Sequence, residues 1–135
     1  MKVYTTMIRE IIEYSSVVYT SMLTQELEER LERVQTRALK NIFGHVYSSK
    51  QVLEMSGLYT LKERREKAAI KFANKMVQNK IFAGWFPKRR SKGRTGDQDS
   101  YVEYPARTDR RRDSPLYYYR RLLNTHRVEY DIRAM

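Results

Sequence analysis

The sequence contains no cysteine in its 135 residues and only two histidines, His45 and His126. The missing thiols exclude disulfides, cysteine nucleophiles and the common structural zinc sites. The two histidines lie far apart and have no partner at ligand spacing, so neither indicates a metal site. A glycine-rich phosphate loop and a serine–histidine–acid pattern are also missing. We therefore expect no enzymatic activity and no metal or other cofactor.

Long apolar runs are missing as well. No stretch approaches the ~20 apolar residues that a membrane-spanning helix needs. The N-terminal stretch carries acidic residues where a signal peptide has an uninterrupted apolar core. Together with the lack of cysteine, this predicts a nuclear or cytoplasmic protein without a membrane partner. Nothing in the sequence indicates a small-molecule substrate.

Positive charge is what the sequence has in excess. Its 27 Lys and Arg residues outnumber 16 Asp and Glu residues, which gives a net charge of +11. A charge of this size favours a polyanionic partner, RNA or DNA. The alternative is that the charge only keeps the chain soluble.

Apolar residues recur at helical spacing in the first half of the chain. Residues 2–23 are rich in β-branched side chains, but their spacing predicts a helix that can bend at Ser15 and Ser16. A second helix is predicted between an N-cap at Thr24 and a stop at Gly44. We expect it to pack through one apolar stripe, which is formed by Leu27, Leu31, Val34, Ala38 and Ile42 and widened by Leu39 and Phe43.

Two further helices begin with the spacing of a capping box. Ser48 with Gln51 starts a short helix, and Thr60 with Glu63 starts a longer one that runs to about residue 80. The exposed side of the longer helix is expected to carry Lys62, Arg64, Arg65, Lys67, Lys71 and Lys75. The aromatic residues that follow it are expected to close the bundle, and the alternative is an exposed binding patch. They are Phe82, Trp85 and Phe86.

The composition changes at Pro87. Residues 87–113 contain too few apolar side chains to offset the entropy of ordering, so we expect a basic flexible linker. Ser114 and Pro115 predict a short helix in the terminal segment, 114–135. The predicted fold is therefore all-α: a three- to four-helix bundle over residues 1–86 with a basic, largely flexible C-terminal tail.

Basic and tyrosine residues cluster in this tail. Guanidinium groups neutralise phosphates, and tyrosine rings stack on unpaired bases at ~1–3 kcal/mol per base. The alternatives are that the tyrosines pack on the bundle while the arginines are solvated, or that a basic run is a nuclear import signal. The candidate nucleic-acid-binding residues are Lys88, Arg89, Arg90, Lys92, Arg94, Arg107, Arg110, Arg111, Arg112, Tyr117, Tyr118, Arg120 and Arg121.

Several motifs, in order along the chain, resemble the region that follows the reverse transcriptase in non-long-terminal-repeat retrotransposon polyproteins, in particular jockey-like and related LINE-type elements. One motif of the first helix consists of Ile8, Arg9, Glu13 and Tyr14. The next, in the second helix, consists of Leu31, Glu32, Val34, Gln35, Arg37 and Ala38. The stretches "LYTLKERREKAAIKF" and "RTDRRRDSPLYYYRRLLN" fit the later parts of that region. The resemblance covers nearly the whole chain.

The sequence departs from this family at several places. Glu10 stands where the family commonly has proline, and Val17, Val18 and Tyr19 replace a Pro-Val-Trp motif. The aspartate pair that holds the polymerase metal ions is missing, as is the endonuclease. The resemblance thus implies a non-catalytic fragment of an RNA-directed DNA polymerase, whose natural start lies upstream and whose partners are RNA or target DNA and the polymerase core.

Two alternatives to this reading stay open. The apolar stripe of the second helix could make the chain a helical protein-interaction module. The chain could also be a translated relic without a selected function.

Overall fold

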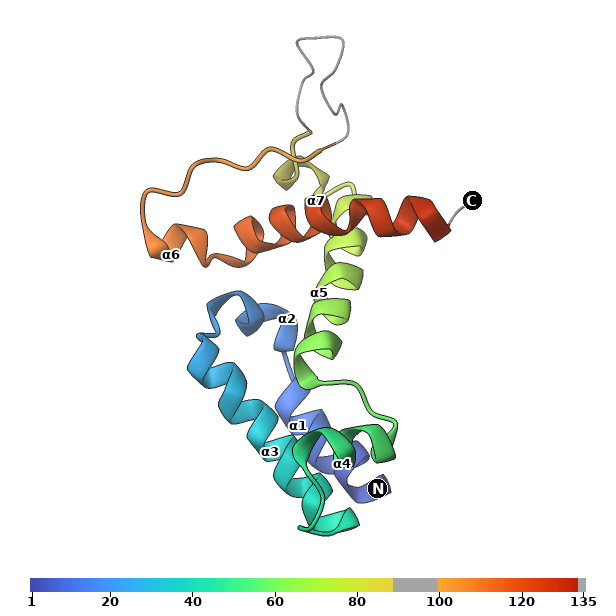
Figure 1. Ribbon diagram of the computed structural model, residues 1–135. Helices are drawn as coiled ribbons and strands as arrows, with labels where there is room; N and C mark the ends of the chain where they lie inside the picture. The colour runs from blue at the N-terminus through green and yellow to red at the C-terminus, as the bar shows by residue number, and fades with distance from the viewer. Residues whose placement is uncertain (89–99, 134–135) are drawn as a thin grey trace. The chain divides into compact units, whose positions relative to one another are not determined.

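The computed structural model describes residues 1–88 and 100–133, with side chains as far as His126. Its regular elements are helices (Figure 1), and within the described residues no β-strand forms. A single isolated β-bridge in that part of the chain joins Lys88 to Tyr101. The predicted all-α fold is therefore confirmed. The described helices include none that is long and apolar enough to cross a membrane.

The chain divides into two compact units, residues 1–68 and 69–135. The division falls inside helix α5 (Leu61–Gln78), not at residue 86 as the sequence suggested. Leu61, in the first turn of α5, is buried within the first unit, and three later residues of α5 belong to the core of the second. One helix therefore supplies core residues to both units.

The N-terminal helix of the first unit is interrupted, as the sequence allowed. A π-helical segment, η1 (Tyr4–Ile8), continues into α1 (Arg9–Glu13), and the chain resumes in α2 (Ser16–Tyr19) and the 3-10 segment η2 (Thr20–Met22). The break lies at Ser15, whose φ of +54° is in the left-handed region. A serine rarely adopts this conformation, so the bend is a defined feature of the backbone.

Helix α3 (Gln25–Phe43) begins and ends where the sequence predicts. The Thr24 hydroxyl accepts a hydrogen bond from the Leu27 N–H at 3.4 Å. At the other end, Gly44 has a φ of +111°, which favours glycine, and its N–H donates to the Lys40 carbonyl.

The apolar stripe predicted on α3 is only partly correct. Leu27, Val34 and Ile42 are 43 %, 46 % and 43 % exposed. The two residues that α3 buries are Leu39, on the widened side of the stripe, and Gln35, which the stripe did not include. Gln35 makes hydrogen bonds inside the unit, as a buried amide requires.

The next two helices start as predicted. Helix α4 (Ser49–Ser56) opens with a complete capping box between Ser48 and Gln51. At the start of α5, the Glu63 N–H donates to the Thr60 hydroxyl at 3.2 Å, and the Thr60 N–H donates to the Glu63 carboxylate at 3.3 Å. Each box satisfies backbone N–H groups that a helix start leaves unpaired.

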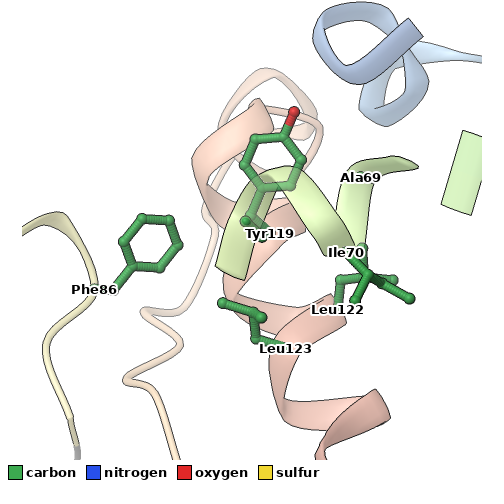
Figure 2. Packing of buried hydrophobic residues seen from close by; sticks show 7 residues of the cluster. Ala69, Ile70, Phe86, Tyr119, Leu122 and Leu123 are labelled. Carbon is green, nitrogen blue, oxygen red and sulfur yellow. The ribbon is translucent and has the colours of Figure 1, made fainter. Parts of the chain in front are cut away.

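The second unit has an apolar core, shown in Figure 2. Its long helix α7 (Pro115–Arg133) starts at the predicted proline, but it has 19 residues and packs on α5 through its buried face. The core consists of Ala69, Ile70 and Ala73 of α5, Phe86, and Tyr119, Leu122 and Leu123 of α7.

The segment between these helices is only partly the linker that the sequence suggested. The 3-10 turn η3 (Ala83–Trp85) leads to Phe86, which is buried, whereas Trp85 remains 50 % exposed. Residues 89–99 lie outside the described residues. After them, Tyr101 packs edge-to-face on Phe86 at 6.0 Å between ring centroids, and a short helix, α6 (Asp109–Arg112), precedes α7.

Candidate nucleic-acid interface

Positive charge is concentrated in the second unit. Residues 69–135 contain 16 Lys and Arg residues against 7 Asp and Glu residues, whereas residues 1–68 contain 11 against 9. The second unit is therefore the part of the chain with the electrostatic character of a polyanion-binding surface.

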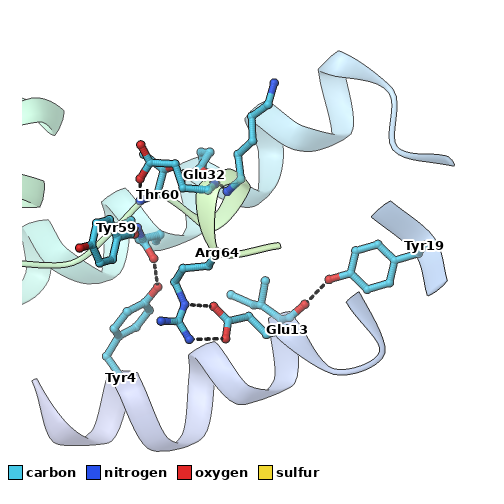
Figure 3. Close-up of polar contacts among 11 residues, drawn as sticks. Tyr4, Glu13, Tyr19, Glu32, Tyr59, Thr60 and Arg64 are labelled. Atoms are coloured by element: carbon cyan, nitrogen blue, oxygen red, sulfur yellow. Dashed lines mark hydrogen bonds and ion pairs between the residues drawn. The ribbon is translucent and has the colours of Figure 1, made fainter. Parts of the chain in front are cut away.

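Gln35, a residue of the second motif, is the centre of a polar network in the first unit, drawn in Figure 3. The Tyr4 hydroxyl donates to Gln35 Oε1 at 2.7 Å, and Gln35 Nε2 donates to the backbone carbonyl of Tyr59 at 3.1 Å. Burial raises the pKa of Tyr4 to about 12, which keeps this hydroxyl protonated as a donor. The network joins η1, α3 and the turn before α5.

Two carboxylates of the same motifs hold the start of α5. Glu13 accepts two hydrogen bonds from the Arg64 guanidinium, one of them from Nη2 at 2.8 Å, and this hydrogen bonding raises the pKa of Arg64. Glu32 accepts a hydrogen bond from the Lys62 N–H at 2.8 Å. These carboxylates position helices.

Arg65 was predicted on the exposed side of α5, and this prediction is wrong. Its side chain is 1 % exposed, and its closest carboxylate, that of Glu28, lies 3.7 Å away. Leu61 and Arg65 are four residues apart, and Ala69 and Ala73 continue this fully buried line along the helix. Arg65 is therefore in the interior because it lies on the packing face of α5.

Among the candidate binding residues, the arginines of α6 and Arg107 just before it are accessible. Arg107, Arg110 and Arg111 are exposed, and the Arg112 guanidinium pairs with Asp109 at 2.8 Å. Lys88 and Arg121 are exposed as well. Four candidates lie outside the described residues, namely Arg89, Arg90, Lys92 and Arg94.

Arg120 has a structural role that the sequence did not reveal. It is 9 % exposed, and its Nε donates to the Trp85 carbonyl at 3.0 Å. Its guanidinium carbon lies 5.3 Å from the centroid of the Tyr104 ring, in a cation–π contact. Arg120 is therefore a positioning residue and not a free phosphate ligand.

The three consecutive tyrosines of α7 divide between packing and a surface hollow. Tyr119 is buried in the core, which raises its pKa to about 12, and Tyr118 packs partly buried against the same core. For these two residues the alternative interpretation of the sequence, packing on the helices, is correct. Tyr117 is half-buried and lines a hollow of about 250 Å³.

This hollow collects residues from three separate stretches of the second unit. Its lining consists of Tyr104, Arg111, Ser114, Leu116, Tyr117 and Arg120. The sequence analysis did not select Tyr104, Ser114 or Leu116. A tyrosine in the "YVEYP" segment was the available signal, but nothing in the sequence indicated that this segment folds back on α7.

Asn124 holds that segment in place. Its Oδ1 accepts a hydrogen bond from the Tyr101 N–H at 2.8 Å, and its Nδ2 donates to the Tyr101 carbonyl at 3.1 Å and to the Glu103 carboxylate at 2.6 Å. A single side chain on α7 thus satisfies both backbone groups of Tyr101 and fixes the path of the chain towards Tyr104. The hollow is therefore held by defined contacts on the α7 side.

The side chains of the described residues offer no cluster of three or more His, Asp or Glu that could hold a metal ion. No protein-family model matches the sequence, and no curated protein or solved structure matches it either. The function must therefore be argued from the charge and the geometry of the chain itself.

Proposed function

We propose that this protein binds nucleic acid, RNA or DNA, without catalysing a reaction, and that the second unit provides the binding surface. The observation that carries the proposal is the concentration of positive charge in residues 69–135. The arginines of α6 are exposed, so part of this charge is accessible to a ligand. Binding of this kind releases counterions from the phosphates, so its affinity depends steeply on salt.

The test is fluorescence anisotropy with the whole chain and a labelled single-stranded RNA of about 12 nucleotides, a length within the site sizes of such proteins. If about four phosphates are neutralised, the affinity falls roughly 50-fold between about 50 and 200 mM salt. An affinity that barely changes over this range contradicts the proposed mechanism.

Replacement of Arg110, Arg111 and Arg112 by alanine is expected to weaken binding to all sequences alike and to reduce the salt slope by about 2. The matched control removes three exposed arginines of α3, Arg30, Arg33 and Arg37, and leaves binding nearly unchanged. A loss confined to one RNA sequence, or an equal loss in the control, contradicts a role for α6.

We propose further that the chain is the post-polymerase helical region of a LINE-type reverse transcriptase. The structural roles of Glu13, Glu32 and Gln35 support this, because all three belong to the resembling motifs and all three join helices in the first unit. Sequencing of the native transcript upstream of the Met1 codon tests the proposal. An in-frame extension that encodes a Tyr- or Phe-led aspartate pair is expected, and a transcript that starts next to Met1 contradicts it.

A second candidate function is a helical interaction module, and the exposed apolar residues of the first unit favour it. Leu27, Val34 and Ile42 of α3 are each more than two-fifths exposed. The N-terminal helices expose a further apolar line, which includes Ile11 and Tyr14 at 77 % and 80 %. A monomer rarely leaves such surface open, so a second copy of the chain is the partner that we test by sedimentation.

A further inference from the structure

The hollow beside α6 has the chemistry of a site for one unpaired nucleobase, and we infer that it binds such a base when the second unit binds a nucleic-acid strand. This inference rests on the proposed function, because the strand must first be held by the arginines. It adds that the protein prefers single strands and that Tyr104 and Tyr117 provide the stacking surface.

The composition of the hollow is the first argument. Its lining combines two tyrosine rings, one leucine, one serine and two arginines, and includes no carboxylate. Aromatic side chains stack on every base, since each base has a π-face, and arginine adds cation–π and phosphate contacts. An acidic or purely aliphatic lining would not suit a base that is joined to phosphates.

The size of the hollow is the second argument. At about 250 Å³ it lies below the usual ~300–1,000 Å³ of pockets for drug-sized ligands and cofactors. It therefore suits one planar heterocycle and is too small for a whole dinucleotide cofactor. Because the rest of a strand stays outside, the surrounding surface must hold the adjoining phosphates.

The arrangement of the two arginines is the third argument. Arg120 is nine-tenths buried, and its contacts with the Trp85 carbonyl and the Tyr104 ring orient that ring at the edge of the hollow. Arg111 is exposed, and its guanidinium has no hydrogen bond or ion pair within the described residues. One arginine thus fixes the stacking surface, while the other remains available for a phosphate of the strand.

The order of the site before binding is the fourth argument. Tyr104 is 44 % exposed, yet the chain leading to it is held by the amide of Asn124. On the other side, the Ser114 hydroxyl donates to the Arg111 carbonyl at 2.8 Å and holds the turn between α6 and α7. A site whose walls are already fixed loses less entropy when a base enters.

The base must be unpaired, because the faces of a base in a duplex are covered by its neighbours and only its edges are accessible. Tyrosine stacking needs a free face. The expected signature is therefore a preference for a single strand over a duplex of the same sequence, and this preference must depend on the two tyrosine rings.

The test uses the whole chain and compares a single strand with the corresponding duplex at one salt concentration. Tyr104→Leu and Tyr117→Leu are each expected to weaken single-strand binding about 5- to 150-fold, the range that corresponds to loss of one stacked base. Duplex binding is expected to stay unchanged. Tyr104→Phe and Tyr117→Phe keep the ring and are expected to bind like the unchanged protein.

The matched control is Tyr47→Leu, which removes a tyrosine of the first unit that is 41 % exposed, close to the 44 % of Tyr104. It is expected to leave both affinities unchanged. A leucine variant of the hollow that binds single strands normally overturns the inference, and so does a phenylalanine variant that fails as badly as the leucine variant. If these tyrosine variants have no effect while the triple α6 variant still loses affinity, the base site is wrong and the proposed function stands.

A second measurement needs no variant and so does not depend on whether a variant folds. A strand that carries one 2-aminopurine reports stacking through quenching of its fluorescence. Quenching on addition of the protein, at a salt concentration where the strand is bound, is the expected result. Binding without quenching at any position along the strand overturns the inference, and an absence of salt-dependent binding overturns the proposed function itself.

Discussion

Gln35 shows how much of this structure depends on single polar residues. It is 1 % exposed, and its side-chain amide accepts from the Tyr4 hydroxyl and donates to the Tyr59 carbonyl. If the amide were removed, the Tyr4 hydroxyl would lose its hydrogen bond in a poorly hydrated place, since Tyr4 is 2 % exposed. The penalty for a buried group left without a partner exceeds the net contribution of a typical hydrogen bond.

We therefore expect Gln35→Leu to destabilise the protein although it adds an apolar side chain to the interior. The free energy of unfolding should fall by about 1–3 kcal/mol, the cost of leaving the buried Tyr4 hydroxyl without a partner. Urea denaturation followed by circular dichroism measures the change. Gln78→Leu, on an exposed position of α5, is the control and should stay within about 0.5 kcal/mol.

The double variant with Tyr4→Phe identifies the cause. Phenylalanine removes the hydroxyl that Gln35→Leu leaves unpaired, so the double variant should be more stable than the sum of the two single losses predicts. Strict additivity would mean that the bond between Tyr4 and Gln35 does not explain the loss.

At the same scale, the burial of polar residues is what the sequence did not reveal. Gln35 and Arg65 are polar residues within amphipathic helices, so the pattern of residue types assigns both to the surface. Their burial depends on partners that are distant in the sequence: Tyr4 lies 31 residues before Gln35, and Glu28 lies far before Arg65. Tyr104 in the candidate base site was missed for the same reason.

Whole elements, in contrast, could be predicted well, because their ends are fixed by neighbouring residues. The caps at Thr24, Ser48 and Thr60 depend on side chains three residues away from the groups they bind. The sequence also indicated that the N-terminal helix can bend at Ser15. The sequence did not show which face of α3 is buried, because its apolar residues alone do not indicate which side of the helix the rest of the unit covers.

Gly57 allows a test at the scale of one element. It ends α4 with a φ of +65°, and a side-chain carbon added there would have no atom within 4 Å. Gly57→Ala should therefore cost about 1–2 kcal/mol through backbone strain alone. Gly84 is the matched control, since an added carbon there also finds open space and its φ lies outside the positive range.

Thermal denaturation of the two alanine variants measures the difference. Gly84→Ala should unfold close to the unchanged protein, and Gly57→Ala should unfold at a lower temperature. Equal midpoints for both variants would mean that the left-handed conformation of Gly57 contributes nothing to the stability of the first unit.

For the whole molecule, the two units differ in what they leave exposed. The second unit carries most of the net charge and has a contiguous apolar core. The first unit is nearly balanced in charge and leaves many large apolar residues open to solvent. Such a division suits a chain that binds a polyanion with one unit and another protein surface with the other.

Self-association through the first unit is the prediction that follows. Val3 just before η1, Met7 of η1 and Ile11 of α1 follow one another at intervals of four residues and are 67 %, 62 % and 77 % exposed. They form an apolar line that a second copy can cover. Sedimentation velocity at two protein concentrations should show a larger species at the higher one. Met7→Lys and Ile11→Lys together should restore the monomer without loss of helix content, because both side chains already face solvent.

Val46→Lys is the control, since Val46 is 95 % exposed between α3 and α4 and is not part of this line, and it should leave association unchanged. A monomer at both concentrations would contradict pairing between copies through this surface.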